Sequence, residues 1–330
     1  MYAINLSHVR REEKHNGFFV NFFVAAVLAG TPILFGIVGE IINEKAGHLN
    51  LGVEGMMSIG AVAGFVVGYW TDNLFFALVA AFVAGMLSAL IYAVLTVTFM
   101  ADQNVTGLTL TVFGIGFSNF VGDFVREKSG STSLKLPENI LESLGKVEIP
   151  VLTDIPVIGK MFFNYNIFVY IGIVVAILAA IYLHKTKAGL NIRAIGENPA
   201  AADAAGIPVT KLKYINLMLG GGICAIGGAY CSMIICNGVW VTSCVNGLGW
   251  IAVALVIFAM WDPNKAIIAA VVFGGFSVLK YYVPQVIPSS VFDMIPFIMT
   301  ILVLIITSMR SSKENSQPKS CGVNYFREER

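Results

Sequence analysis

Charged and amide side chains interrupt the apolar sequence of this chain between positions 39 and 57. The stretch reads GEIINEKAGHLNLGVEGMM and holds Glu40, Asn50 and Glu54, with Met57 at its end. Ionisable groups are costly in hydrocarbon, so they usually face a protein interior or a watery cavity when they occur there. The stretch therefore indicates either a pathway for a polar solute or a solvated turn between two ordinary helices.

Hydroxyl and amide groups recur between positions 104 and 119. Asn104 and Thr106 precede Phe113 and Asn119, and their spacing could place several polar groups along one side of a helix. Such groups could bond a ribose or a base, with the phenyl ring as an apolar face. The alternative is that the hydroxyls bond their own helix backbone and the amides hold helices together.

A second interruption lies at positions 246–250, which read NGLGW and open a short apolar run of about fourteen residues. A short run after glycines predicts a broken membrane element opposite the first, where transporters often place their substrate. Asn246 could then line a pathway and Trp250 could stack on a base, although tryptophan more commonly anchors a helix at the membrane interface.

The stretch 189–207 predicts a short capped helix outside the membrane. Asn198 is a good N-cap, Pro199 suits the first helical turn, alanines follow, and Gly206 can adopt a left-handed stop. About seven residues give a rod of about 10 Å, which is too short to cross a membrane. Its small side chains favour either a partner's groove or packing on the chain itself.

The elements that position these residues follow from composition. Hydrophobic residues make up 57% of 330 positions and charged residues only 12%, which leaves too little polar surface for a water-soluble globule. Each helical crossing needs about 20 apolar residues, so we expect an all-α membrane bundle of about 8–10 spans in contact with lipid. The predicted spans are 17–38, 51–70, 74–100, 105–125, 167–183, 214–236, 248–261, 266–283 and 291–309, with broken or re-entrant helices near 40–60 and 240–255.

The chain divides into a polar segment 1–16, a transmembrane domain 17–309 and a flexible tail 310–330. Inside the domain, 126–166 is a long external loop and 184–213 a cytoplasmic loop. Lysines and arginines are retained on the cytoplasmic side. Eleven of them lie in the second loop, the tail and Lys265, against five in the external loop, so we place the tail in the cytoplasm. Three more near the N-terminus favour an even number of crossings.

Two of these stretches carry a family resemblance. Residues 39–57 match a G-E-x-I-x-E-x-x-G-x-x-N-L-G-x-E-G-M-M pattern, and residues 194–207 match A-I-G-x-N-x-x-A-A-x-x-x-G-I. The chain therefore resembles the ATP-binding-cassette permeases of the simple-sugar and branched-chain amino acid class, specifically their nucleoside-importing subgroup. It departs at 259–262, where AMWD stands in place of a smaller, glycine-containing sequence.

The resemblance implies a permease subunit that imports nucleosides, or simple sugars, across the plasma membrane. Implied partners are a homologous second permease, a cytoplasmic ATPase docked on the capped helix, and an extracellular substrate-binding lipoprotein. The candidate pathway residues are Glu40, Asn50, Glu54, Met57, Asn104, Thr106, Phe113, Asn119, Asn246 and Trp250. The implied ATPase-coupling residues are Glu197, Asn198, Pro199, Ala200, Ala201, Asp203 and Gly206.

Other classes of protein fit the sequence less well. The sequence has no G-x-x-x-x-G-K-[ST] motif, so we expect no cofactor in this chain, with ATP and magnesium on the partner ATPase. No membrane-enzyme motif, metal-ligand spacing or concentrated basic patch for nucleic acid occurs either, so we predict that the chain is not an enzyme. The alternative is an ion-coupled secondary transporter, which needs carboxylates deep in well-formed helices, and only Glu54 is a serious candidate.

Overall fold

The computed structural model describes residues 3–147, 158–282, 294–295, 298–299, 301–302, 305 and 316–326. Six of the described helices are long and apolar enough to cross a membrane, and two shorter apolar helices make eight. The predicted all-α membrane bundle is confirmed, and twelve of the nineteen positions of its ninth predicted run, 291–309, lie outside the described residues. Apart from two isolated bridges, no strand pairing occurs in the part that the structure describes.

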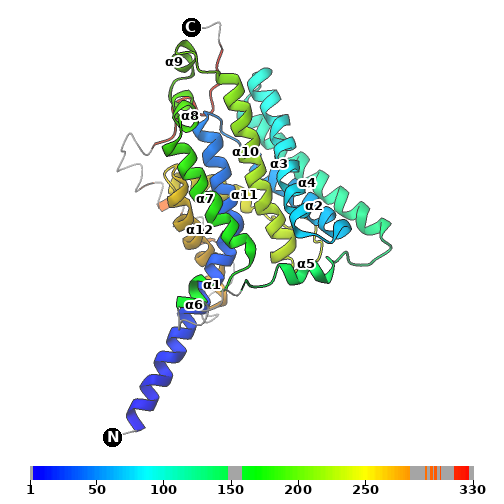
Figure 1. Cartoon of the computed structure of the whole chain (residues 1–330), viewed down its shortest axis with the longest axis vertical. Helices are drawn as coiled ribbons and strands as arrows, with labels where there is room; N and C mark the ends of the chain where they lie inside the picture. The colour runs from blue at the N-terminus through cyan, green and yellow to red at the C-terminus, as the bar shows by residue number, and fades with distance from the viewer. Residues whose placement is uncertain are drawn as a thin grey trace.

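The helices follow the apolar runs closely (Figure 1). The long elements are α1 (Ala3–Lys45), α2 (Val53–Thr71), α3 (Leu74–Ala93) with its continuation η1 (Val94–Thr98), α4 (Gln103–Lys128), α7 (Ile167–Lys185) and α10 (Val209–Tyr230) with its continuation η2 (Cys231–Ile235). The short ones are α5 (Glu138–Ser143), α6 (Ile158–Phe162), α8 (Lys187–Glu197), α9 (Pro199–Ala204), α11 (Leu248–Phe258), α12 (Pro263–Val278) and η3 (Leu279–Tyr281).

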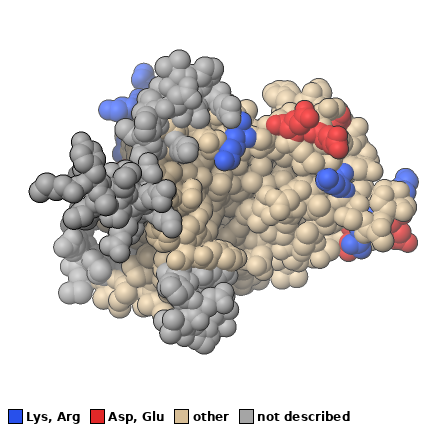
Figure 2. Space-filling model, turned by 90° about the horizontal axis from the view of Figure 1, so that it is seen from below, with Lys and Arg blue, Asp and Glu red and all other residues tan. Residues whose placement is uncertain are grey.

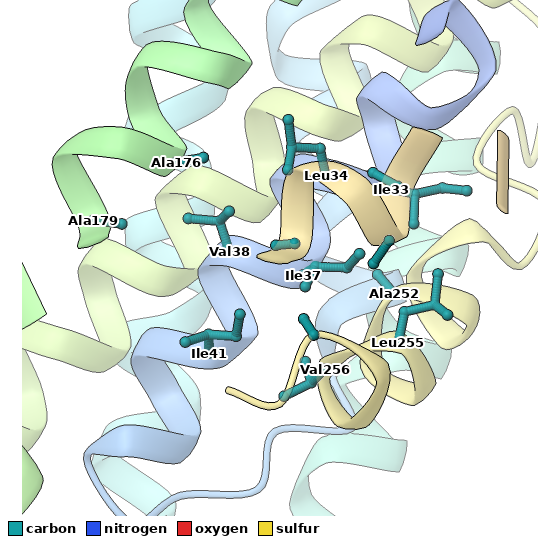
Figure 3. Close-up of a cluster of buried hydrophobic side chains, with 14 of the residues drawn as sticks. Ile33, Leu34, Ile37, Val38, Ile41, Ala176, Ala179, Ala252, Leu255 and Val256 are labelled. Carbon is teal, nitrogen blue, oxygen red and sulfur yellow. The ribbon is translucent and has the colours of Figure 1, made fainter. Parts of the chain in front are cut away.

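Helix α1 lies at the centre of the bundle. Its branched side chains Ile33, Ile37 and Ile41 are fully buried and pack against small residues of α7 and α11 (Figure 3). Close packing of this kind is what holds helices together in lipid, where there is no hydrophobic force between them. The alanines Ala179 and Ala252 allow both neighbouring helices to approach α1.

A glycine of α10 shows how close the helices come. A Cβ atom on Gly228 would lie 1.7 Å from the carbonyl oxygen of Met57 on α2. No side chain fits at that distance, so a larger residue would push the helices apart. The glycines of 220–222 and 227–228 therefore serve tight packing.

The first predicted interruption lies between two helices and not within one. Helix α1 ends at Lys45, α2 begins at Val53 and runs without a break to Thr71, and the turn 46–52 joins them. Asn50 in this turn is fully buried, and its backbone N–H donates to Glu40 Oε1 at 2.8 Å. The turn can stay inside the protein because a carboxylate of α1 satisfies its backbone.

The second interruption is a broken span, as the sequence predicts. After η2 the chain runs without helix through 236–247 and then forms α11. Asn237, Ser243 and Asn246 adopt positive φ angles of 51°, 54° and 50°, a region that asparagine tolerates better than most residues. The two asparagines therefore favour the non-helical backbone of 236–247.

The two ends of the chain lie at opposite ends of the bundle (Figure 1). Tyr282, after α12, donates to the carbonyl of Asn21 in α1, whereas Ser320 in the tail bonds α8 at the other end. The number of crossings and the side of the N-terminus stay predictions, because most of the ninth predicted run lies outside the described residues. Viewed from the end opposite α8 and α9, charged side chains are few (Figure 2).

Candidate functional site

Glu54 fixes the start of the broken span. Its Oε1 accepts from the backbone N–H of Gly247 and its Oε2 from that of Gly249, both at 2.7 Å. The carboxylate thereby satisfies two of the amides that a helix leaves unpaired at its N-terminus, and its charge favours the positive end of α11. At 4% exposure, Glu54 is a cap that holds the break in place.

The break lies inside the membrane span. Gly36 of α1 contacts Ala252 of α11, and Gly36 precedes the end of α1 at Lys45 by nine residues. At 1.5 Å a residue this is about 14 Å from the end of the helix. Irregular backbone at such depth is tolerated only where protein buries it or a water-filled cavity faces it.

Part of the irregular segment is open. Thr242, Ser243 and Asn246 are exposed. The side chain of Asn119 in α4 makes two hydrogen bonds to Ser243. Asn119 Oδ1 accepts from the backbone N–H of Ser243 at 2.8 Å, and its Nδ2 donates to the hydroxyl at 3.1 Å. One amide side chain thus aligns the extended segment with α4.

Exposed aromatic rings occur on α4 and α11. Phe113 and Phe117 of α4 are 51% and 43% exposed and stack with ring centroids 5.8 Å apart, and Trp250 of α11 is 38% exposed. Phe117 is two positions from Asn119, and Trp250 is four positions from Asn246. We call the group formed by Phe113, Phe117, Asn119, Thr242, Ser243, Asn246 and Trp250 the open face.

The predicted pathway residues fall into two groups. Phe113, Asn119, Asn246 and Trp250 belong to the open face, and Asn104 is exposed near the start of the same helix α4. The other group is buried and bonded within the protein. Its members are Glu40, Asn50, Glu54, Met57 and Thr106, whose hydroxyl donates to the carbonyl of Asp102 in its own helix at 2.7 Å.

Polar side chains are buried around the turn 46–52. Glu40 Oε2 accepts from Asn43 Nδ2 at 2.9 Å, and Asn50 Oδ1 accepts from the backbone N–H of Gly52 at 2.9 Å. Burial, with a smaller effect from the positive charge of Lys213, holds the pKa of His48 well below its usual value. His48 is therefore a neutral ring in the folded protein.

Helices α8 and α9 form the predicted capped unit. Asn198 Oδ1 accepts from the backbone N–H of Ala201 at 3.0 Å, Pro199 opens α9, and Gly206 follows it with a φ of 81°. Ala202 packs inward on Ile195 and Val209. The other coupling candidates lie outside this small core: Glu197, Asn198, Ala201 and Gly206 are exposed, while Pro199, Ala200 and Asp203 are half-buried.

Three features of the structure are not predicted from the sequence. Glu44, fully buried at the end of α1, accepts a 2.6 Å bond from Trp261 Nε1 across 217 positions. Ser243 pairs with Asn119 across 124 positions. The part of the tail that is described, 316–326, is packed on the bundle, in contrast to the predicted flexible tail, because Ser320 and Asn324 find backbone carbonyls there.

These features define the chain as a membrane-embedded permease: a polytopic helical bundle with a broken span, an open polar face and a capped helical unit at one end. Comparison of the sequence with known families agrees. Residues 19–304 match the family described as "Branched-chain amino acid transport system / permease component". The chain belongs to this family and is a permease subunit of an ATP-binding-cassette transporter.

Individual relatives span most of the chain. It is 34% identical over 324 residues to the guanosine ABC transporter permease protein NupQ of Bacillus subtilis, covering 93% of this chain and 96% of that one. It is 33% identical over 313 residues to the nucleoside ABC transporter permease protein NupC of Lactococcus lactis, covering 91% and 95%. The putative glucose ABC transporter permease protein TsgC13 of Haloferax volcanii is 35% identical over 257 residues, covering 78% and 75%.

Proposed function

We propose that this chain is one of two permeases that together form the pathway of an ATP-driven importer of nucleosides, with simple sugars as the second candidate. The observation that carries the proposal is the open face. Its irregular backbone lies at membrane depth and leaves Thr242, Ser243 and Asn246 exposed. Lipid cannot satisfy such groups, so a water-filled pathway completed by a second permease is the environment that suits them.

Nucleosides suit the chemistry of this face. A base offers a flat ring for Phe113 or Trp250, and a ribose offers hydroxyls for amide side chains such as Asn246. Two of the relatives described above carry nucleoside or guanosine in their names, which supports this class of solute. The sugar alternative is kept because a third relative is a putative glucose permease.

The partners and orientation belong to the same proposal. The exposed side of α9, with Ala201 and Gly206, is small and uncharged and would fit a groove of a cytoplasmic ATPase that carries the ATP and magnesium. A lipid-anchored binding protein would deliver solute at the other end, outside the plasma membrane. The tail and α8 to α9 would then be cytoplasmic, in accord with the excess of lysine and arginine in 184–213 and 310–330.

The bonds of Glu54 argue against an ion-coupled transporter, for which this residue was the one serious candidate. Both oxygens of Glu54 accept backbone N–H groups at 2.7 Å. A coupling ion or proton at this carboxylate would displace the bonds that start α11, so Glu54 is poorly suited to bind and release one in each cycle.

Labelling with a water-soluble maleimide tests the open face in the assembled complex. We expect a Thr242→Cys variant to react faster than the unsubstituted chain, and guanosine delivered by the binding protein to slow that reaction. Leu178→Cys serves as the matched control, because Leu178 on α7 is 57% exposed and would face lipid. Equal labelling at both positions would contradict the proposed pathway.

A further inference from the structure

The described tail segment, 316–326, binds both coupling helices. The backbone N–H of Ser320 donates to the carbonyl of Gly196 at 2.9 Å, and its hydroxyl donates to the same oxygen at 2.6 Å. The hydroxyl of Tyr325 donates to Asp203 Oδ2 at 2.8 Å. The segment is therefore fixed at the end of α8 and within α9.

The same segment also holds the turn between η1 and α4. Asn324 Nδ2 donates to the carbonyls of Met100 and Ala101 at 2.6 and 3.0 Å. Its Oδ1 accepts from Gln103 Nε2 at 3.2 Å, and Gln103 is itself buried. The start of α4, the helix that contributes to the open face, is thus joined to the tail through three hydrogen bonds of the Asn324 side chain.

A third attachment leads to the broken span. Gln317 Nε2 donates to Glu44 Oε2 at 3.4 Å, and the thiol of Cys321 lies 3.9 Å from the same oxygen. That oxygen also accepts the 2.6 Å bond from Trp261, three residues beyond the end of α11. Burial leaves Glu44 no water to replace these partners, so the contacts are strong in the protein interior.

We propose that the segment 316–326 is a coupling strap, which transmits movement of α8 and α9 to α11 and to the start of α4. This rests on the proposed function, because it assumes that an ATPase moves α9. Apart from the strap, α9 packs on α8 and α10. With the strap, a displacement of α9 also pulls on Glu44 and Asn324, which are bonded to Trp261 just after α11 and to the turn before α4.

The experiment separates transmission from docking. Ser320→Ala with Tyr325→Phe removes the two side-chain hydrogen bonds between the strap and the coupling helices and leaves the backbone bond from Ser320 to Gly196. The loss is equivalent to about a tenfold change in an equilibrium. Complexes of the permease, ATPase and binding protein are reconstituted in vesicles, and ATP hydrolysis and uptake of labelled guanosine, or of glucose if the wild type takes up the sugar, are measured together. We expect the ATPase to co-purify normally and uptake per ATP hydrolysed to fall about tenfold.

A matched control and a second variant complete the test. Val323→Ala changes a 60% exposed side chain of the same segment and should leave uptake per ATP unchanged. Trp261→Phe cuts the chain of contacts at its other end, so it should lower the ratio similarly and add little to the double variant. It also carries the test alone if the double variant does not fold.

Three results would overturn the strap: an unchanged ratio in the Ser320 and Tyr325 variant, additive losses when Trp261→Phe is combined with it, or failure of the ATPase to co-purify. The last would make the segment a docking surface and not a transmission element. A wild-type complex that shows no ATP-dependent uptake of either solute would instead contradict the proposed function.

Discussion

Single buried side chains decide where this chain is allowed to be irregular. Glu54 accepts two backbone N–H groups at the start of α11, and Glu40 accepts one from the turn 46–52. Glu54 of α2 bonds the start of α11, and Glu40 of α1 bonds the turn that follows its own helix. Acidic residues in an apolar sequence can thus mark positions where a non-helical backbone needs a hydrogen-bond acceptor. Their burial alone does not assign them to the solute pathway.

Replacing Glu54 with alanine should destabilise the permease. Two N–H groups, one buried and one half-buried, would lose their acceptor, at a cost of about 1–3 kcal/mol for the buried one and less for the other. Thermal unfolding in detergent measures this as a lower midpoint, with a fall in transport. Ser58→Ala is the control, because its hydroxyl bonds only the carbonyl of Glu54 in its own helix. A variant that unfolds like the wild type would mean that Glu54 is not a cap.

His48 should give the folded protein an acid-sensitive step. Its pKa is lowered in the folded state, so near pH 6.5 the imidazole binds a proton in the unfolded chain but stays neutral in the folded protein. The contribution of the neutral ring to the free energy of unfolding is fully present above that pH. It decreases as the pH falls below it, by up to about 1.4 kcal/mol per pH unit. Unfolding midpoints from pH 7.5 to 5 should drop more steeply for the wild type than for His48→Gln, and parallel curves would refute this.

Trp261 shows why the departure at 259–262 is accommodated. Met260 and Trp261 adopt φ angles of 52° and 55°, in the region where a glycine would be expected. Non-glycine residues there cost about 1–2 kcal/mol each. The hydrogen bond from Trp261 Nε1 to buried Glu44 offsets part of that cost. The left-handed conformation at Trp261 is therefore tolerated because its side chain bonds α1.

Among the elements, α9 is defined almost wholly by local sequence. An asparagine cap, a proline in the first turn and a glycine stop lie within nine positions, and the structure has a helix between them. The long apolar runs likewise predicted their helices, because hydrocarbon requires every backbone group to be bonded within its segment. These parts of the fold are readable from sequence since their causes are neighbours in the chain.

The broken span and the tail could be predicted only in part. Glycines at 247 and 249 predicted a break, but the partners that hold it, Glu54 and Asn119, lie more than a hundred positions away. The tail looks flexible because it is polar, and its order depends on carbonyls of Gly196 and Met100 that exist as acceptors only after the bundle folds. Which residues line the pathway stays a prediction.

A bulky side chain on the exposed side of α9 should prevent docking without unfolding the permease. Ala201 is exposed, so Ala201→Trp should abolish co-purification of the ATPase and ATP-driven uptake, while Ala202→Trp should instead unfold α9 because Ala202 is buried. Ser131→Trp, on an exposed position of the 126–166 loop, is the control. Normal recovery of the ATPase with Ala201→Trp would count against this role for α9.

At the scale of the whole molecule, the two ends of the bundle have different tasks. One end gathers α8, α9, the turn before α4 and the described tail into one hydrogen-bonded unit. The other carries the chain around 129–147 and 158–166. The open face lies between them, at the level where α11 begins, so a force applied at one end can change the exposure of a solute site.

The most direct measurement is uptake by vesicles of defined composition. Permease pair, ATPase and binding protein are reconstituted together, and labelled guanosine or glucose is offered with and without ATP. We expect accumulation only when all partners and ATP are present, and none when an ion gradient replaces ATP. Accumulation by this chain alone, driven by a proton or sodium gradient, would contradict it.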